Sequence, residues 1–329
     1  MKFTSEELKL LKQTSTRMMA VSTEEPAETV ETAKVPKPVC PAIPVGKGFA
    51  AVAGMQSLKQ LVTENFINVL RNRECAKVYG IIPPSILFYG PSGCGKSYFA
   101  KRMAEELGIH YMKVVPDDIA CTWIHGTQEK IGELFRKAER NAPTLMFLDE
   151  IDAMVPKRNG LPGNQAFNGE VNEFLCKLDN AGERGIYVLA ATNRPDYIDP
   201  AILRSGRFDE LIYVDMPDHE ARKGLFTLAL ADIPVEEGLD YDLLAKHSSG
   251  FNCSDITYIV KAAARKTFNE TVRNGGYPYL KVTQSLLMDT MDKKEPSVSP
   301  RSIQEFERLR SIYSSKDTNR KKVNIGFHV

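Results

Sequence analysis

Eight consecutive residues, Gly90 to Ser97, have the types and spacing that phosphate binding requires. The segment reads Gly-Pro-Ser-Gly-Cys-Gly-Lys-Ser, which matches the pattern G-x-x-x-x-G-K-[ST]. Its glycines let backbone N–H groups approach phosphate oxygens, Lys96 would reach the β- and γ-phosphates, and the Ser97 hydroxyl would bind Mg²⁺. We therefore expect ATP and Mg²⁺ to be held by Pro91, Ser92, Gly93, Cys94, Gly95, Lys96 and Ser97.

Two neighbouring carboxylates form a second chemical group. Asp149 and Glu150 come directly after the apolar run Leu145–Leu148. A buried strand there would place both carboxylates at the carboxyl edge of a sheet, where α/β proteins bind ligands. Asp149 would hold Mg²⁺, mostly through water, and Glu150 would orient and activate the attacking water. The pair therefore favours ATP hydrolysis over ATP binding alone.

Three further polar side chains are candidates for contacts with the γ-phosphate. Asn193 follows the apolar run Ile186–Ala191, and its amide could bind the γ-phosphate or the attacking water. Arg204 and Arg207 could stabilise the charge that spreads over the phosphate oxygens in the transition state. Taken alone, Asn193 is equally well explained as a turn residue, and two arginines in a loop are usually solvated.

The hydrophobic pattern predicts the scaffold that must position these groups. A helical pattern follows Lys96 and stops at Gly108, and another carries apolar residues from Ile131 to Ala138. Strands that alternate with helices predict an α/β sheet with helices on both faces. After Pro217 the strand signals fade, and helical patterns continue to about Ser314. Five apolar runs predict buried parallel strands, at Ile86–Tyr89, Tyr111–Val115, Leu145–Leu148, Ile186–Ala191 and Leu211–Val214.

Three regions follow from these patterns. Residues 1–47 are expected to form a short amphipathic helix at 3–19 and a flexible linker rich in proline. Residues 48–217 would form the nucleotide-binding α/β domain, and residues 218–329 a small helical lid with a closing helix and a tail. We expect the helix at 3–19 to dock in a groove of a partner protein, although a frayed terminus is an equal alternative.

Composition limits the partners. The chain has 43 Lys and Arg against 42 Asp and Glu, so no net charge draws it to nucleic acid or to an anionic membrane. It has no apolar run of membrane-spanning length, and its start does not resemble a secretory signal. Its six cysteines never form C-x-x-C, which is typical of free thiols in a reducing compartment. We expect a cytoplasmic protein with no nucleic-acid partner and no membrane insertion.

The span from Thr192 to Arg207, together with the phosphate loop and the acidic pair, resembles the AAA family of AAA+ ATPases. The resemblance begins near Val52-Ala53-Gly54 and runs to the last helices, and the closing helix after Pro300 is similar to that of katanin and spastin relatives. It implies that Asn193 is a sensor, that Arg204 and Arg207 act on ATP of a neighbouring subunit, and that the chain forms a ring, usually a hexamer. It also implies an adenine pocket formed by Val52, Ala53, Cys253 and Ser254.

The same resemblance places Trp123 and Ile124 where the family has the pore loop that grips an extended polypeptide substrate. A core or ordinary loop position is the alternative for Trp123. The chain departs from the family at His125–Gln128, where an acidic motif is usual, and at Asn168-Gly169, where paired arginines are usual. These departures concern contacts between subunits. A third departure, Cys253-Ser254 in place of Gly-Ala, makes the expected adenine pocket slightly fuller.

The residues and the resemblance together favour an ATP-hydrolysing motor that remodels, unfolds or disassembles proteins through a central pore. An ATP-dependent assembly scaffold, or a switch linked to nucleic acid, with slow hydrolysis, is the alternative. A fused metalloprotease is excluded because the sequence contains no H-E-x-x-H. We further expect Cys94, near a helix N-terminus, to have a lowered pKa, so that alkylation would block ATP binding; an inert small residue is the alternative.

Overall fold

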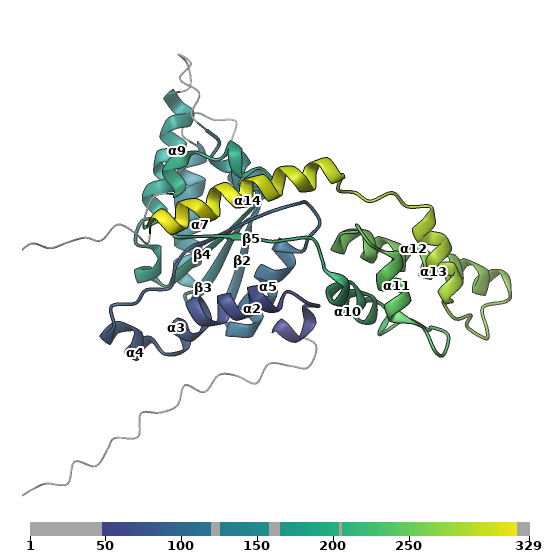
Figure 1. The fold of residues 1–329 in the computed structure, drawn as a ribbon. Helices are drawn as coiled ribbons and strands as arrows, with labels where there is room; N and C mark the ends of the chain where they lie inside the picture. Colours follow the sequence, from purple (N-terminus) through teal and green to yellow (C-terminus); the bar gives the residue numbers. More distant parts are fainter. Residues whose placement is uncertain (1–47, 120–125, 158–164, 204–205, 321–329) are drawn as a thin grey trace, which may run out of the picture. The chain divides into compact units, whose positions relative to one another are not determined.

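The computed structural model describes residues 48–119, 126–157, 165–203 and 206–320 (Figure 1). The expected helix at 3–19 and the linker lie outside these residues. Five parallel strands form one sheet in the order β2-β3-β4-β1-β5. This confirms the predicted α/β class and all five strand positions to within about one residue. The strands are β1 (Ile86–Tyr89), β2 (His110–Val114), β3 (Thr144–Leu148), β4 (Ile186–Thr192) and β5 (Glu210–Tyr213).

The strands are apolar at successive positions because both faces of the sheet are covered. On the inner strand β1, Leu87 faces one side, while Ile86 and Phe88 face the other. Every residue of β3 and β4 is buried. The register pairs Tyr89 with Thr192 and Leu148 with Ala190, so β1 and β4 end level at the carboxyl edge and β3 ends two residues before them.

Helices surround the sheet and continue beyond it. Gly108, at φ 65°, ends α5, as the sequence predicts. Before β4 come α2 (Gln56–Val62), a π-turn (Thr63–Ile67), α3 (Asn68–Arg71), α4 (Arg73–Val78), α5 (Lys96–Leu107), α6 (Pro116–Ile119), α7 (Gly126–Arg140), α8 (Ile151–Met154) and α9 (Gln165–Leu178). After β5 come α10 (His219–Leu230), α11 (Tyr241–His247), α12 (Cys253–Arg273), α13 (Gln284–Asp292) and α14 (Pro300–Arg320). Short 3₁₀ turns lie at Gly48–Ala51, Ala181–Arg184, Pro195–Tyr197 and Pro200–Leu203.

Two hydrophobic cores hold these helices on the sheet. On one face, α7 contributes Ile131 and Phe135, and α9 contributes Phe174. On the other face, α5 contributes Phe99 and Met103, beside residues of the segment that follows α2. Because α5 starts directly at the end of β1, its packing fixes the position of the loop between them.

A third core is formed by helices alone. Side chains of α10, α11, α12 and α13 enclose Phe226, Leu244, Ile259 and Leu287, each of which is fully buried. The chain after β5 is therefore helical, as the sequence predicts. Among the residues that the structure describes, every helix is too short or too polar to span a lipid bilayer.

Candidate nucleotide site

The strand order brings three predicted site segments to one edge of the sheet. Strands β3, β4 and β1 are neighbours, and they end immediately before Asp149, Asn193 and Gly90. The carboxyl edge of a parallel sheet is where α/β folds place their ligands. Residues more than 100 positions apart in sequence therefore meet around the loop Gly90–Ser97.

The glycines of this loop have conformations and neighbours that other residues could not have. Gly90 has φ 148°, and a Cβ there would lie 2.2 Å from the Val214 carbonyl oxygen. Gly93 has φ 74°, and a Cβ there would lie 2.5 Å from Asn252 Nδ2. Gly95, at φ 89°, directly precedes α5. The loop is thus a tight concave turn that ends at a helix N-terminus, which is the geometry that binds phosphate.

Lys96 turns back into this loop. Its side chain is 7% exposed, and its ammonium donates to the carbonyl oxygens of Gly90 and Pro91, each at 2.8 Å. Burial lowers the pKa of Lys96 to about 8, and the nearby carboxylates of Asp149 and Asp152 partly oppose this shift. A buried cation whose partners are neutral carbonyls is well suited to receive an anion.

Ser97 and Asp149 are joined directly. The Ser97 hydroxyl lies 3.0 Å from Asp149 Oδ2, and the backbone N–H of Asp149 donates to Val114 at 2.9 Å. The ammonium of Lys113, on β2, lies 2.8 Å from the same Oδ2 atom. A hydroxyl and a carboxylate side by side are oxygen ligands that suit Mg²⁺, and Lys113 supplies positive charge at that place.

The other two polar candidates flank this pair. Glu150 is exposed and has a left-handed backbone, with φ 56° and ψ 48°, so its side chain leaves the strand direction just before α8. Asn193 Oδ1 is buried and has no hydrogen-bond partner among the residues that the structure describes. An unpaired buried amide oxygen is costly, and a ligand or water with a donor group would satisfy it. Both observations fit a nucleotide site.

A cavity of about 600 Å³ adjoins the loop. It has the size that a nucleoside requires, and its walls are mainly apolar. The four residues expected at an adenine pocket, Val52, Ala53, Cys253 and Ser254, lie together around it. The remaining lining comes from Ala51, Met55, Gly93, Gly95, Tyr98, Leu225, Leu228, Ala229, Thr257, Tyr258 and Lys261.

The expectation of a reactive thiol at Cys94 is wrong. The side chain is fully buried and lies 3.5 Å from Met216 Sδ. Burial raises the pKa of Cys94 to about 12, and Cys253 adds to this rise more than Lys96 lowers it. Desolvation of the thiolate therefore outweighs the helix N-terminus. The side chain faces the core, so Cys94 can contribute only its backbone to a ligand in the loop.

Of the two expected arginines and the two expected pore-loop residues, the structure describes only Arg207. Arg207 is held within its own chain, because Nε donates to Asp179 at 3.1 Å and a terminal nitrogen donates to the Ala201 carbonyl at 3.0 Å. Its side chain is 19% exposed. Arg204, Trp123 and Ile124 lie outside the described residues.

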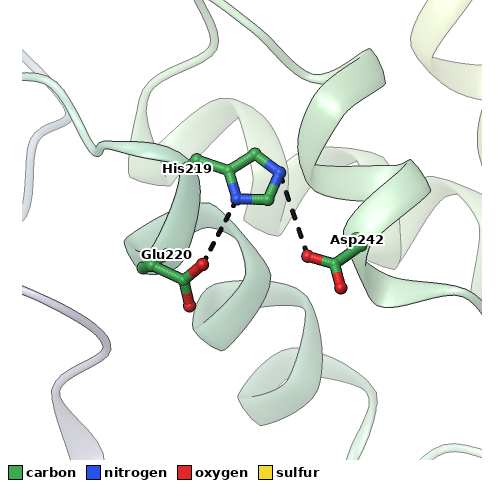
Figure 2. Close-up of side chains that lie close together, drawn as sticks. All are labelled: His219, Glu220 and Asp242. Carbon is green, nitrogen blue, oxygen red and sulfur yellow. Dashed lines mark ion pairs between the residues drawn. The ribbon is translucent and has the colours of Figure 1, made fainter.

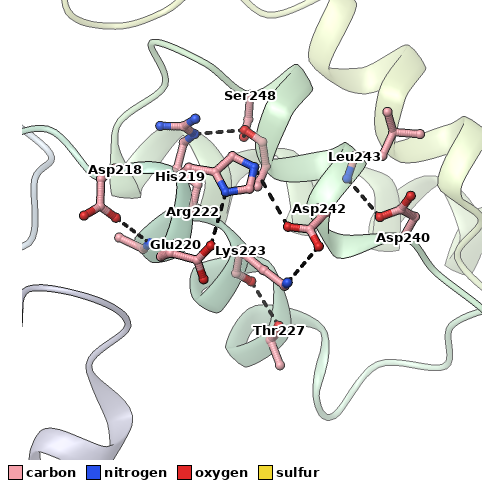
Figure 3. A network of polar contacts seen from close by, with 12 residues as sticks. Asp218, His219, Glu220, Arg222, Lys223, Thr227, Asp240, Asp242, Leu243 and Ser248 are labelled. Carbon is pink, nitrogen blue, oxygen red and sulfur yellow. Dashed lines mark hydrogen bonds and ion pairs between the residues drawn. The ribbon is translucent and has the colours of Figure 1, made fainter.

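A second group of titratable side chains lies on α10 and α11. Figure 2 shows Glu220 and Asp242 on opposite sides of the His219 ring. Glu220 Oε1 lies 3.5 Å from Nδ1, and Asp242 Oδ1 lies 4.0 Å from Nε2. One ligand atom from each of the three residues lies within 4.8 Å of the others, but both carboxylates are exposed, and exposed acidic groups commonly gather without a metal ion. Lys223 also lies 2.8 Å from Asp242 (Figure 3). We therefore interpret this cluster as exposed polar contacts between α10 and α11.

Comparison with known proteins agrees with this geometry. The model of the family described as "ATPase family associated with various cellular activities (AAA)" matches residues 86–216, from β1 to the end of the sheet. The chain contains an ATPase domain of the AAA family. The matched AAA domain contains the phosphate loop, the acidic pair, Asn193 and Arg207.

Two curated relatives contain the same AAA region within longer chains. The chain is 31% identical over 268 residues to the "Cell division cycle protein 48 homolog" of Archaeoglobus fulgidus, which covers 78% of this chain and 37% of that protein. It is 33% identical over 223 residues to the "Putative cell division cycle ATPase" of Plasmodium falciparum, which covers 67% of this chain and 18% of that protein. The chain thus spans well under half the length of both relatives.

Sequence reasoning missed two residues of the site. Lys113 reaches Asp149 only because β2 and β3 pair in the register that aligns Lys113 with Phe147. Asn252 donates to the Ser92 carbonyl oxygen from 160 positions away. The spacing of Asn252 and Asp255 at the start of a helical pattern could have predicted a helix cap. No feature of the sequence, however, predicts the contact of Asn252 with the loop.

Proposed function

We propose that this chain hydrolyses ATP with Mg²⁺ in the loop Gly90–Ser97 and uses the energy to remodel other proteins. The observation that carries the proposal is the convergence of Lys96, Ser97, Asp149 and Asn193 at the ends of three neighbouring strands. The attacking water could donate to the unpaired Asn193 oxygen, and phosphate oxygens could accept from the buried Lys96 ammonium, which now donates to backbone carbonyl oxygens.

Each residue has a separable part in this proposal. Backbone N–H groups of the loop bind the phosphates, and Lys96 exchanges its carbonyl partners for phosphate oxygens. Ser97 and Asp149 hold Mg²⁺, which neutralises phosphate charge, and Lys113 must leave Asp149 when the cation binds. Glu150 orients the attacking water and accepts its proton, and Asn193 fixes that water or the γ-phosphate.

Ring assembly, most simply a hexamer, belongs to the same proposal. In it, Arg204 and Arg207 reach the ATP of a neighbour, Trp123 and Ile124 grip a polypeptide, and residues 3–19 dock on a partner. Residues 48–217 form the motor domain in this proposal, and residues 218–329 form its lid. Support comes from the family and from the exposed position of Glu150 at the sheet edge. The balanced charge favours a protein substrate over nucleic acid, and the six scattered cysteines, which never form C-x-x-C, favour a reducing, cytoplasmic place of action.

A scaffold that hydrolyses ATP slowly is the second candidate. It is favoured by the contact of Lys113 with Asp149, because an ammonium on the metal-binding carboxylate competes with Mg²⁺. The two candidates differ in turnover number and in whether ATP hydrolysis depends on assembly.

The experiment that tests the proposal measures ATPase rate against protein concentration, with particle mass followed in parallel. We compare wild type with Glu150→Gln, which keeps the size of the side chain and removes the proton acceptor. Wild-type activity per chain should rise with concentration as a ring forms, and Glu150→Gln should bind ATP with a rate at least about 100-fold lower. Rates independent of concentration, with a constant monomer mass, would contradict the ring. Equal rates in the two proteins would contradict the role of Glu150.

A further inference from the structure

The carbonyl groups of the phosphate loop are held from two sides. Lys96 binds the carbonyl oxygens of Gly90 and Pro91. The next two carbonyl oxygens are bound by the N-terminus of α12. Asn252 Nδ2 donates to Ser92 at 3.0 Å, and the backbone N–H of Ser254 donates to Gly93 at 3.1 Å. Four consecutive carbonyl groups of the loop are therefore fixed before a nucleotide binds.

Fixing a carbonyl group also fixes an N–H group. In a trans peptide the C=O and the following N–H point in opposite directions. The contacts of Ser92 and Gly93 with α12 thus turn the N–H groups of Gly93 and Cys94 away from α12. Those are donors that a phosphate-binding loop offers to its ligand. Without the contacts, each peptide plane could rotate and present a carbonyl oxygen to the phosphates, which would repel them.

Asn252 is suited to this contact by having both an acceptor and a donor. Its Oδ1 accepts from the Asp255 N–H at 2.8 Å and so caps α12, while its Nδ2 binds Ser92. The residue is 2% exposed, and Gly93 packs directly against it. An aspartate could cap the helix but would place an anionic oxygen against the Ser92 carbonyl, and a serine could cap it but is too short to reach the loop.

Asp255 connects Asn252 to the C-terminal part of the chain. Asp255 accepts from the Asn252 N–H at 3.3 Å and lies 2.8 Å from the Lys294 ammonium. It also accepts from the backbone and the hydroxyl of Ser297, which lies just before α14. Its side chain is 2% exposed. The contact at the loop is therefore part of a buried network and not a mobile surface interaction.

We propose that Asn252 is a positioning residue that presets the phosphate loop for its ligand from the lid helix α12. The proposal rests on the proposed function, in that the ligand of the loop is the phosphate chain of ATP. It means that a displacement of α12 releases the Ser92 and Gly93 carbonyl groups, so that lid movement directly changes nucleotide affinity.

The test compares Asn252→Asp and Asn252→Ser with wild type in the full chain. Both variants keep an oxygen that caps α12, and both lose the donor that reaches Ser92. We measure affinity for a non-hydrolysable ATP analogue, thermal unfolding, and amide hydrogen exchange of peptides covering residues 90–97 in nucleotide-free protein. Thr283→Ala is the matched control, because Thr283 caps α13 by accepting from the Leu286 N–H in the same helical core but does not contact the loop.

Both Asn252 variants should bind the analogue about five- to tenfold more weakly and exchange faster in the loop. Asn252→Ser should unfold within a few degrees of the wild-type temperature, whereas Asn252→Asp should unfold at a lower temperature because it buries a charge against the Ser92 carbonyl. Thr283→Ala should unfold at a lower temperature with unchanged affinity. Weaker binding by Asn252→Asp alone would assign the effect to charge repulsion and overturn the proposal. If wild type binds no nucleotide, the proposed function fails, but loop exchange in nucleotide-free protein still decides the role of Asn252, because unchanged exchange in both variants overturns it.

Discussion

At the scale of single residues, the site keeps charged and polar groups in unfavourable surroundings. Lys96 is a buried cation with neutral partners, and Asn193 has a buried oxygen that none of the described residues pairs with. Such groups lower the stability of the folded chain, and they are retained where they act on a ligand. Both residues were predicted as site residues from their motifs, but their strained surroundings are visible only in the structure.

Lys96 should therefore lower the stability of the nucleotide-free protein near neutral pH. Below pH 8 both the folded and the unfolded chain hold the Lys96 proton. Between pH 8 and about 10.5 the unfolded chain holds more protons, so the free energy of unfolding rises with pH in this window. Lys96→Met should be about 1–3 kcal/mol more stable than wild type at pH 7, and the difference should shrink as pH rises above 8.

Chemical denaturation of wild type and Lys96→Met at several pH values checks this prediction, since other titrating groups cancel in the difference. Lys101→Met, on the exposed side of the same helix, is the matched control and should show no such pH dependence. A stability difference that stays constant from pH 7 to pH 10 would contradict the assigned pKa.

At the scale of elements, α14 joins parts of the site that are far apart in the sequence. The ring of Tyr313 lies 5.3 Å from that of Tyr89, the residue before Gly90, and its hydroxyl lies 3.5 Å from the Pro195 carbonyl oxygen. The guanidinium of Arg310 lies over the Tyr213 ring at 5.2 Å and 3.4 Å from Asp215. The helix therefore contacts the ends of β1 and β5 and the segment after Asn193.

Removing the Tyr313 ring should loosen this contact. Tyr313→Ala should lower the free energy of unfolding by about 1–2 kcal/mol, because the ring is half-buried against Tyr89. Tyr313→Phe keeps the ring and should lie within about 0.5 kcal/mol of wild type, since the hydroxyl contact is long. Denaturant titration of the three proteins measures the effect. An equal loss of stability in both variants would place the contribution in the hydroxyl group instead.

At the scale of the whole molecule, the proposed ring requires arginines that act on the ATP of a neighbouring subunit and not on the ATP of their own chain. Arg207 is bound to Asp179 and Ala201 in its own chain, whereas the proposal requires it at the ATP of a neighbour. The Asp179 side chain is 48% exposed, and exposed ion pairs contribute little to stability. Breaking the pair between Arg207 and Asp179 should therefore cost little free energy.

Mixing two inactive variants tests this requirement. Arg207→Ala keeps its own nucleotide loop, and Lys96→Met keeps its arginines, so a mixed ring contains complete sites between unlike neighbours. An equal mixture should regain about a quarter of wild-type ATPase activity. Asp179→Asn is the control and should stay within about threefold of wild type. If the mixture stays inactive and Asp179→Asn is as impaired as Arg207→Ala, Arg207 positions its own chain and does not act on a neighbour.

The sequence by itself determined the strands, the phosphate loop and the acidic pair, because each depends on a local pattern. The fixed spacing of the glycines and Lys96 predicts a phosphate-binding loop, and the apolar runs predict buried strands. The C-terminal helices followed in the same way from their periodicity.

Only the tertiary structure decided the environment of these residues. The pKa of Cys94 was wrongly predicted because burial, which no short motif encodes, outweighs the helix N-terminus. The contacts of Lys113 with Asp149 and of Asn252 with Ser92 depend on strand register and on where α12 packs. Such contacts join distant positions in the chain, and their strength depends on geometry and burial, which exist only once the cores have formed.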